Sequence, residues 1–172
     1  MTAVDLDTEF WRAIQRARQP RVDAALSDLG LSRLVQWGVA TVHVRGSFYE
    51  PADDGELFAI IAPCVFDGEL VDLCAVVLPE GKPTTRCGAG WALGEDEIER
   101  ARWEWDTLRL VDTPLQWLRE PRRHACVIDW RIAHLRLADI GKIVCDTLAL
   151  GERVLAAFEH PPIPAPLVSI DR

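Results

Sequence analysis

Three evenly spaced aspartates are the residues of this sequence best placed to do chemistry. Asp112, Asp129 and Asp146 are each 17 residues apart. Carboxylate oxygens are the ligands that Mg²⁺ and Mn²⁺ prefer, so a cluster of these side chains could hold a metal ion for reactions on phosphate esters. The plainer interpretation is that each aspartate caps its own helix, because Asp accepts backbone N–H bonds at helix starts. Both hypotheses stay open at this point.

Basic and aromatic residues near these aspartates extend the candidate site. Arg119 and Trp130 belong with the aspartates to a candidate ligand-binding edge, and Arg122, Arg123 and His124 form a candidate anion-binding loop. Forked guanidinium donors match the geometry of phosphates and carboxylates. The alternative is a solvated connection, since charged loop residues are mostly exposed. No metal ligand set or catalytic residue is predicted beyond these candidates.

The elements that position the aspartates follow from the same repeat. In region 91–160, each Asp follows a short apolar run and precedes a helical stretch, so the unit is a strand, an Asp and a short helix. Alternating strands and helices predict parallel neighbours joined by right-handed crossovers. In such a layer, ligands usually bind at the C-terminal ends of the strands. We therefore expect all three aspartates at one edge of the sheet.

The first half of the chain predicts a helical pair in region 1–36 and an antiparallel β-meander in region 37–90. The clearest signal is a hairpin of Leu57 to Phe66 and Glu69 to Leu78 joined by Asp67-Gly68, because Asp-Gly favours the type I′ turn. Its register places Cys64 opposite Val71 and Cys74 opposite Ile61. The fold class is α+β, and we expect one domain over 1–172 with a Pro-rich tail at 161–172.

Composition restricts the classes of function. The net charge of −8 and the pI near 5.0 make nucleic acid an improbable partner, because nucleic-acid affinity comes largely from clustered Lys and Arg. Apolar runs are too short for a membrane span, and the acidic N-terminus does not match a signal peptide. Five cysteines without a metal-binding or redox spacing indicate free thiols in a reducing compartment, so a cytoplasmic location is expected.

A resemblance adds one expectation about biological context. The segments 113–119 and 127–131, read as TPLQWLR and VIDWR, resemble small uncharacterised proteins of phage-like or mobile elements in GC-rich bacterial genomes. The resemblance covers the C-terminal half and implies an accessory role in such elements. It supplies no catalytic residues.

Three hypotheses about function follow from these patterns. The leading one is a non-enzymatic binding or assembly module that uses apolar and aromatic surface for a protein partner or for self-association, with no cofactor. The first alternative is a Mg²⁺- or Mn²⁺-dependent enzyme acting on phosphate esters. The second alternative is a small-ligand sensor, which requires an apolar cavity with a few polar groups.

Overall fold

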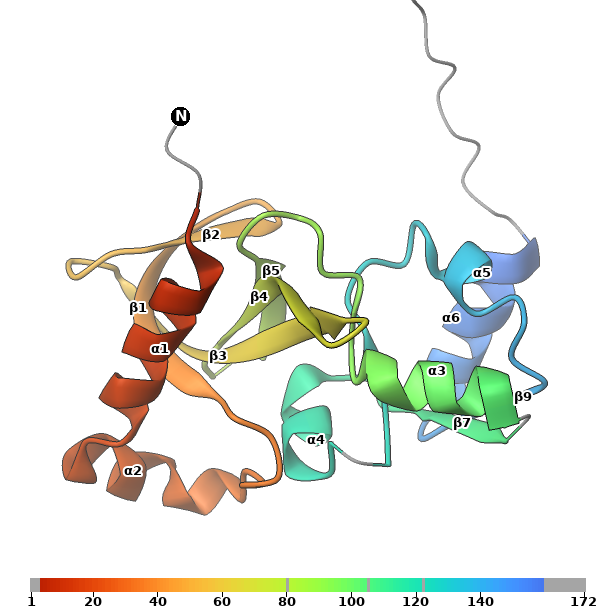
Figure 1. Ribbon diagram of the computed structural model, residues 1–172, viewed down its shortest axis with the longest axis horizontal. Helices are drawn as coiled ribbons and strands as arrows, with labels where there is room; N and C mark the ends of the chain where they lie inside the picture. The colour runs from red at the N-terminus through yellow and green to blue at the C-terminus, as the bar shows by residue number, and fades with distance from the viewer. Residues whose placement is uncertain (1–3, 80, 105, 122, 160–172) are drawn as a thin grey trace, which may run out of the picture.

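A small closed β-barrel forms the first half of the chain. The computed structural model describes residues 4–79, 81–104, 106–121 and 123–159 (Figure 1). Around the barrel the strands follow the order β1-β2-β5-β4-β3, and all neighbours are antiparallel except β2 and β5. The strands are β1 (Gly38–Arg45), β2 (Phe48–Pro51), β3 (Leu57–Phe66), β4 (Glu69–Val77) and β5 (Lys82–Thr85). The predicted meander is therefore closed into a barrel by the short parallel contact between β2 and β5.

The predicted hairpin is present, but its predicted register is wrong. Asp67 and Gly68 have φ angles of 51° and 78°, as a type I′ turn requires. A β-bulge shifts the register between Cys64 and Val65, so that Cys64 lies opposite Asp72 and Cys74 lies opposite Ala62. An extra residue in one strand displaces every later pair by one position, and a sequence pattern of period two does not reveal it.

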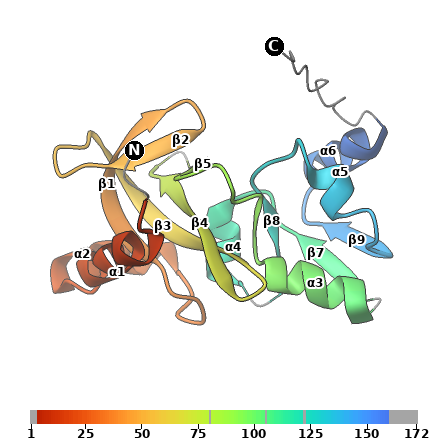
Figure 2. The same ribbon diagram turned by 45° about the horizontal axis from the view of Figure 1, so that its top comes forward.

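Two helices and a 3₁₀ turn cover one side of the barrel, as the predicted helical pair requires (Figures 1 and 2). They are α1 (Leu6–Ala17), α2 (Pro20–Leu26) and η1 (Ser27–Leu29). Asp5 caps α1 by accepting the backbone N–H of Thr8 at 3.0 Å. Helix α1 packs closely on β1, because a Cβ on Gly38 would lie 2.5 Å from the backbone of Ala13.

The second half of the chain has the predicted mixture of short strands and helices. Strands β7 and β9 are parallel, and Leu110 of β7 also pairs in parallel with Ala125 on its other side. Strand β8 departs from the prediction, because it pairs antiparallel with β6. The elements are β6 (Ala92–Leu93), α3 (Glu95–Glu104), β7 (Thr107–Leu110), α4 (Pro114–Arg119), β8 (Cys126–Val127), α5 (Ala133–Arg136), β9 (Lys142–Cys145) and α6 (Leu148–Glu159).

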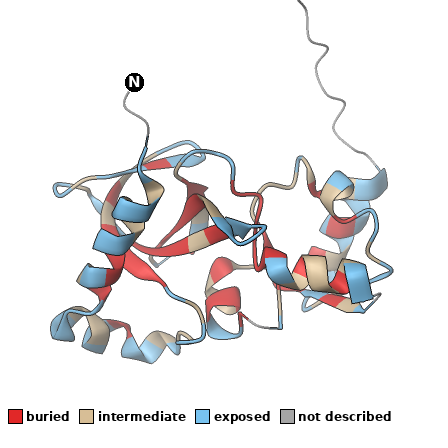
Figure 3. Ribbon diagram, viewed as in Figure 1, coloured by how far each residue is buried: buried red, intermediate tan, exposed pale blue. Residues whose placement is uncertain are grey.

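Buried side chains connect the barrel to the second half. One core cluster contains Ile60 and Val76 of the barrel together with Leu93, Trp117 and Leu118. A second cluster lies wholly in the second half, around β7 and α6, and a third lies inside the barrel against α1 (Figure 3). The fold is α+β with a mostly antiparallel sheet. None of the described helices is long and apolar enough to cross a membrane.

Candidate functional site

Two of the three predicted aspartates lie at the same edge of the small parallel sheet. Asp146 follows β9 directly, and its backbone N–H donates to the carbonyl of Leu110 at the end of β7. Asp112 follows β7 by two residues. Asp129 lies elsewhere, because its chain turns away and its backbone N–H donates to the carbonyl of Trp91 at 3.0 Å. The expectation that all three aspartates share one edge is therefore wrong.

The aspartates are not the helix caps that the plainer interpretation predicted. The hydroxyl of Thr113 caps α4 and forms a capping box with Gln116. The hydroxyl of Thr147 accepts the backbone N–H of Leu150 at the start of α6. Thr has two acceptor lone pairs and caps helices almost as well as Asp. The capping residue is therefore the one directly after Asp112 and the one directly after Asp146, one position later than the aspartate pattern predicts.

Two of the three predicted aspartates form hydrogen bonds with another side chain. Asp146 accepts the amide of Gln116 at 2.9 Å. Asp129 forms a forked contact with Arg131, at 2.9 and 2.7 Å to its two oxygens, and these hydrogen bonds lower the pKa of Asp129. Among the described residues, no group of three His, Cys, Asp or Glu side chains could hold a metal ion.

The other predicted site residues have separate contacts. Arg119 donates to the backbone carbonyl of Leu29 at 3.0 Å and so links α4 to η1. Trp130 lies under the guanidinium of Arg153, 4.4 Å from the ring centroid, which is a cation–π contact to α6. Among the described residues, neither side chain forms a hydrogen bond or ion pair with one of the aspartates, so a shared ligand-binding edge stays a prediction.

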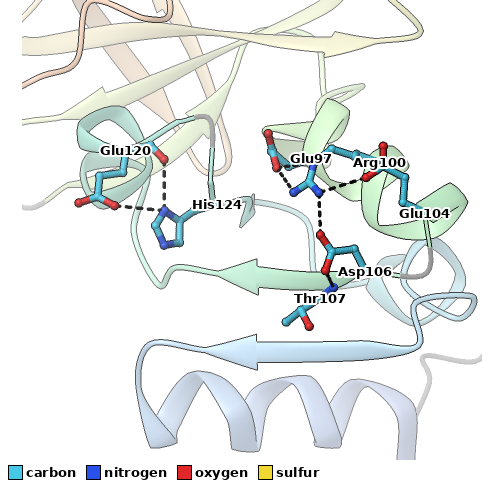
Figure 4. Close-up of polar contacts among 7 residues, drawn as sticks. All are labelled: Glu97, Arg100, Glu104, Asp106, Thr107, Glu120 and His124. Atoms are coloured by element: carbon cyan, nitrogen blue, oxygen red, sulfur yellow. Dashed lines mark hydrogen bonds and ion pairs between the residues drawn. The ribbon is translucent and has the colours of Figure 1, made fainter.

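The predicted anion-binding loop has an acidic neighbour. The Nδ1 atom of His124 lies 3.2 Å from the backbone carbonyl of Glu120 and 3.8 Å from its carboxylate (Figure 4). Arg123 is exposed, and Arg122 lies outside the described residues. An anion at this loop would meet the Glu120 carboxylate beside the imidazole. Anion binding by the loop stays a prediction without a supporting contact.

Helix α3 carries a separate charged network that serves structure. Arg100 contacts Glu97 at 2.6 Å, Asp106 at 2.9 Å and Glu104 at 3.5 Å, which ties the helix to the start of β7 (Figure 4). These hydrogen bonds raise the pKa of Arg100. Because this guanidinium forms ion pairs with three carboxylates, it is not available to a ligand.

One fully buried carboxylate was not predicted from the sequence. Asp72 lies on β4 with 0% of its surface exposed, inside an otherwise apolar run. Its two oxygens accept five backbone N–H groups, from Leu73 at 2.7 Å, Arg86 at 3.1 Å, Cys87 at 2.9 Å, Ala89 at 2.8 Å and Gly90 at 2.9 Å. A carboxylate has about four lone-pair sites, so these five donors use its full acceptor capacity, and the contacts fix the loop that leads from β5 to β6. Its role is structural, and a lone acid within a predicted buried strand is the signal that could have found it.

A large apolar concavity of the second half lies beside β9. A groove of about 740 Å³ runs between α6 and the segment that leads into β9. We call it the α6 groove and define it by Leu137, Ile140, Ile143, Cys145, Asp146, Leu148, Glu152, Leu155 and Phe158. Its charged lining residues are both acidic. The described residues show β9 paired on one side, with β7, so its other edge is free beside the groove.

Helix α6 is more apolar than its contacts require. Leu150 and Val154 face the core, while Leu148, Leu155 and Phe158 are 81%, 61% and 41% exposed. The three exposed side chains follow one another by seven and three residues and therefore lie on one stripe of the helix, next to the buried stripe. In a layer of strands and helices, this stripe would cover the next strand of the sheet. Among the described residues, no strand occupies that position.

Comparison of the chain with protein-family models, with curated proteins and with solved structures finds no match. The function must therefore be argued from the contacts of this chain itself.

Proposed function

We propose that the protein is a non-enzymatic binding module whose α6 groove receives an extended apolar segment of a protein partner. The observation that carries the proposal is the uncovered apolar stripe of α6 beside the free edge of β9. Contiguous exposed apolar surface on a globular protein usually marks an interaction site. A sheet edge with unpaired backbone groups can accept a further strand from a partner.

The backbone and the side chains of the groove would act together in this binding mode. Backbone N–H and C=O groups of β9 would pair with the incoming segment and supply affinity that does not depend on its sequence. Alternate side chains of that segment would contact Leu155, Phe158 and Ile143, because successive residues of a strand point to opposite faces. The segment should therefore carry apolar residues at every second position.

Charge favours a basic partner over a second copy of this chain. Asp146 and Glu152 line the groove, and the whole chain has a net charge of −8. Like charges disfavour self-association, whereas Lys or Arg on either side of an apolar segment would complement the rim of the groove. The partner segment is therefore expected to combine an alternating apolar core with basic flanks.

Two broader expectations accompany this proposal. A cytoplasmic location is supported by the five cysteines, all of which are free thiols. An accessory role in a bacterial mobile element stays a prediction based on the sequence resemblance.

Selection from a random peptide library displayed on phage tests the proposal. The full chain is immobilised and panned, and each enriched peptide is tested against Leu155→Lys and against Ala156→Lys. Both positions are exposed and lie on the same helix, but Ala156 is not in the groove. We expect enriched peptides with alternating apolar residues and basic flanks that bind the Ala156 variant and not the Leu155 variant. Peptides that bind both variants equally, or concentration-dependent dimerisation abolished by Leu155→Lys, would contradict the proposal.

A further inference from the structure

A second concavity lies between the barrel and the start of α3, far along the chain from the α6 groove. It has a volume of about 570 Å³, within the range of sites that bind small molecules. The turn at Asp67 and Gly68 closes one side, and the apolar lining consists of Leu34, Val35, Pro63, Val65, Trp117 and Pro121. We call it the α3 cleft.

The charged residues of the α3 cleft all have the same sign. Asp67, Glu95, Asp96 and Glu99 line it, and none of the described lining residues is Lys, Arg or His. Glu99 is paired with Arg102, so its charge is partly neutralised. The net field inside the cleft therefore favours a cation over an anion or a neutral ligand.

Glu95 distinguishes this cleft from an ordinary acidic surface. It is 5% exposed, and its Oε1 atom accepts the indole N–H of Trp91 at 2.6 Å. Among the described residues, no donor contacts the Oε2 atom. Fully enclosed side-chain atoms without a partner belong, among the described residues, to Arg102, Trp117 and His134. The Oε2 atom of Glu95 is not one of these atoms, so it is partly accessible. The free oxygen of Glu95 therefore reaches the cleft that the residue lines.

The surroundings of Glu95 hold the carboxylate in place without pairing it. Burial raises the pKa of Glu95, while Arg136 and Arg102 act in the opposite direction. Among the described residues, neither cation forms a hydrogen bond or ion pair with Glu95. The guanidinium of Arg136 lies over the rings of Phe66 and Trp91, at 5.2 and 5.8 Å from their centroids, and Arg102 donates to the backbone carbonyl of Arg136 at 2.6 Å. A buried carboxylate with one unsatisfied oxygen gains most from a donor that carries positive charge.

We propose that the α3 cleft binds a small organic cation, with an ammonium or guanidinium group at Glu95 and Asp96 and an apolar body against Val65 and Trp117. The apolar lining selects against strongly hydrated metal ions, and the volume accommodates a body of ring size. This site is separate from the α6 groove, so either proposal can be correct without the other.

Binding of phenethylamine, compared with its neutral analogue 2-phenylethanol, tests this site. Both are titrated at pH 7 into the ¹⁵N-labelled full chain, and amide shifts report the location and the dissociation constant. We expect saturable shifts around the start of α3 for the amine, with the alcohol binding at least about tenfold more weakly, because the two differ in one charged donor. Equal binding of the two probes, or shifts elsewhere in the chain, would overturn the proposal.

Matched variants assign the interaction to the carboxylates. Glu95→Gln keeps an acceptor for the Trp91 indole and removes the charge, and we expect it to weaken amine binding about tenfold. Asp96 is exposed, so Asp96→Asn replaces the Glu95 variant in the test if that variant fails to fold. It should weaken amine binding by a smaller factor. Glu152→Gln in the α6 groove is the control and should leave binding unchanged. Unchanged binding in both cleft variants would refute the site, as would stronger binding of Mg²⁺ or Ca²⁺ than of the amine at the same residues.

Discussion

Replacing the buried Asp72 should damage the fold more than any exposed substitution. Its carboxylate is fully enclosed and accepts five backbone N–H groups, four of them from the loop 86–90. That loop leads directly into Trp91, whose indole holds Glu95. In Asp72→Ala these donors lose their acceptor inside the protein.

The size of the effect follows from the number of donors. A buried donor left without an acceptor costs about 1–3 kcal/mol, so four loop donors give a sum of roughly 4–12 kcal/mol. The loop can shift toward water, and single substitutions rarely exceed about 4–5 kcal/mol. We therefore expect Asp72→Ala to lower the free energy of unfolding by about 4 kcal/mol. Asp72→Asn keeps one acceptor oxygen but turns an NH₂ group toward two donors, so a loss of about 2 kcal/mol is expected.

Urea unfolding followed by circular dichroism measures these changes. With a slope of about 2 kcal/mol/M, the midpoint of Asp72→Ala should fall by about 2 M. Asp139→Ala, at an exposed position, is the control and should stay within about 0.5 kcal/mol of the wild type. A change below about 1 kcal/mol in Asp72→Ala, with an unchanged slope, would refute the claim that this carboxylate holds the loop.

Three further substitutions test other contacts of the fold. Glu9→Ala removes the partner of Arg86 and of the Tyr49 hydroxyl and should lower the free energy of unfolding in urea by about 2 kcal/mol. The control Gln15→Ala, on the exposed side of the same helix, should have little effect. Thr113→Ala should cost about 1 kcal/mol through loss of the cap of α4, and Asp112→Ala less than about 0.5 kcal/mol; the reverse order in thermal unfolding would restore the aspartate as the cap. Burial raises the pKa of Glu95 above its ordinary value of 4.5, so the stability it contributes is full below that pH and is lost as the pH rises. Glu95→Gln should therefore gain stability relative to the wild type between pH 4 and pH 7, and a parallel pH dependence of the two proteins would contradict this.

The sequence predicted local elements well where a single residue type determines the backbone. Asp67-Gly68 predicted the hairpin turn because few other pairs adopt two positive φ angles. The alternation of strands and helices predicted the parallel pairing of β7 with β9. The hairpin turn depends on two neighbouring residues, and the parallel pairing follows from the order of strands and helices along the chain; a sequence pattern contains both.

The features that the sequence did not predict depend on residues far apart in the chain. Closure of the barrel needs the parallel contact of Phe48 with Thr85, and the five donors of Asp72 come mainly from a loop fourteen or more positions away. The aspartate pattern suggested one shared edge, but Asp129 diverges because its segment pairs with Trp91. The uncovered stripe of α6 results from the end of the sheet at β9, which pairs with β7 alone among the described residues.

The affinity of a selected peptide for the wild type and for two lysine variants tests the central claim most directly. A fluorescein-labelled peptide with an alternating apolar core and basic flanks is titrated with each protein, and its anisotropy gives the dissociation constant. Burying a Leu side chain stabilises by about 1.5–3 kcal/mol, so Leu155→Lys should weaken binding at least about tenfold. Ala156→Lys should leave the dissociation constant within about twofold of the wild type. Equal affinities for all three proteins would show that the α6 groove does not bind the peptide.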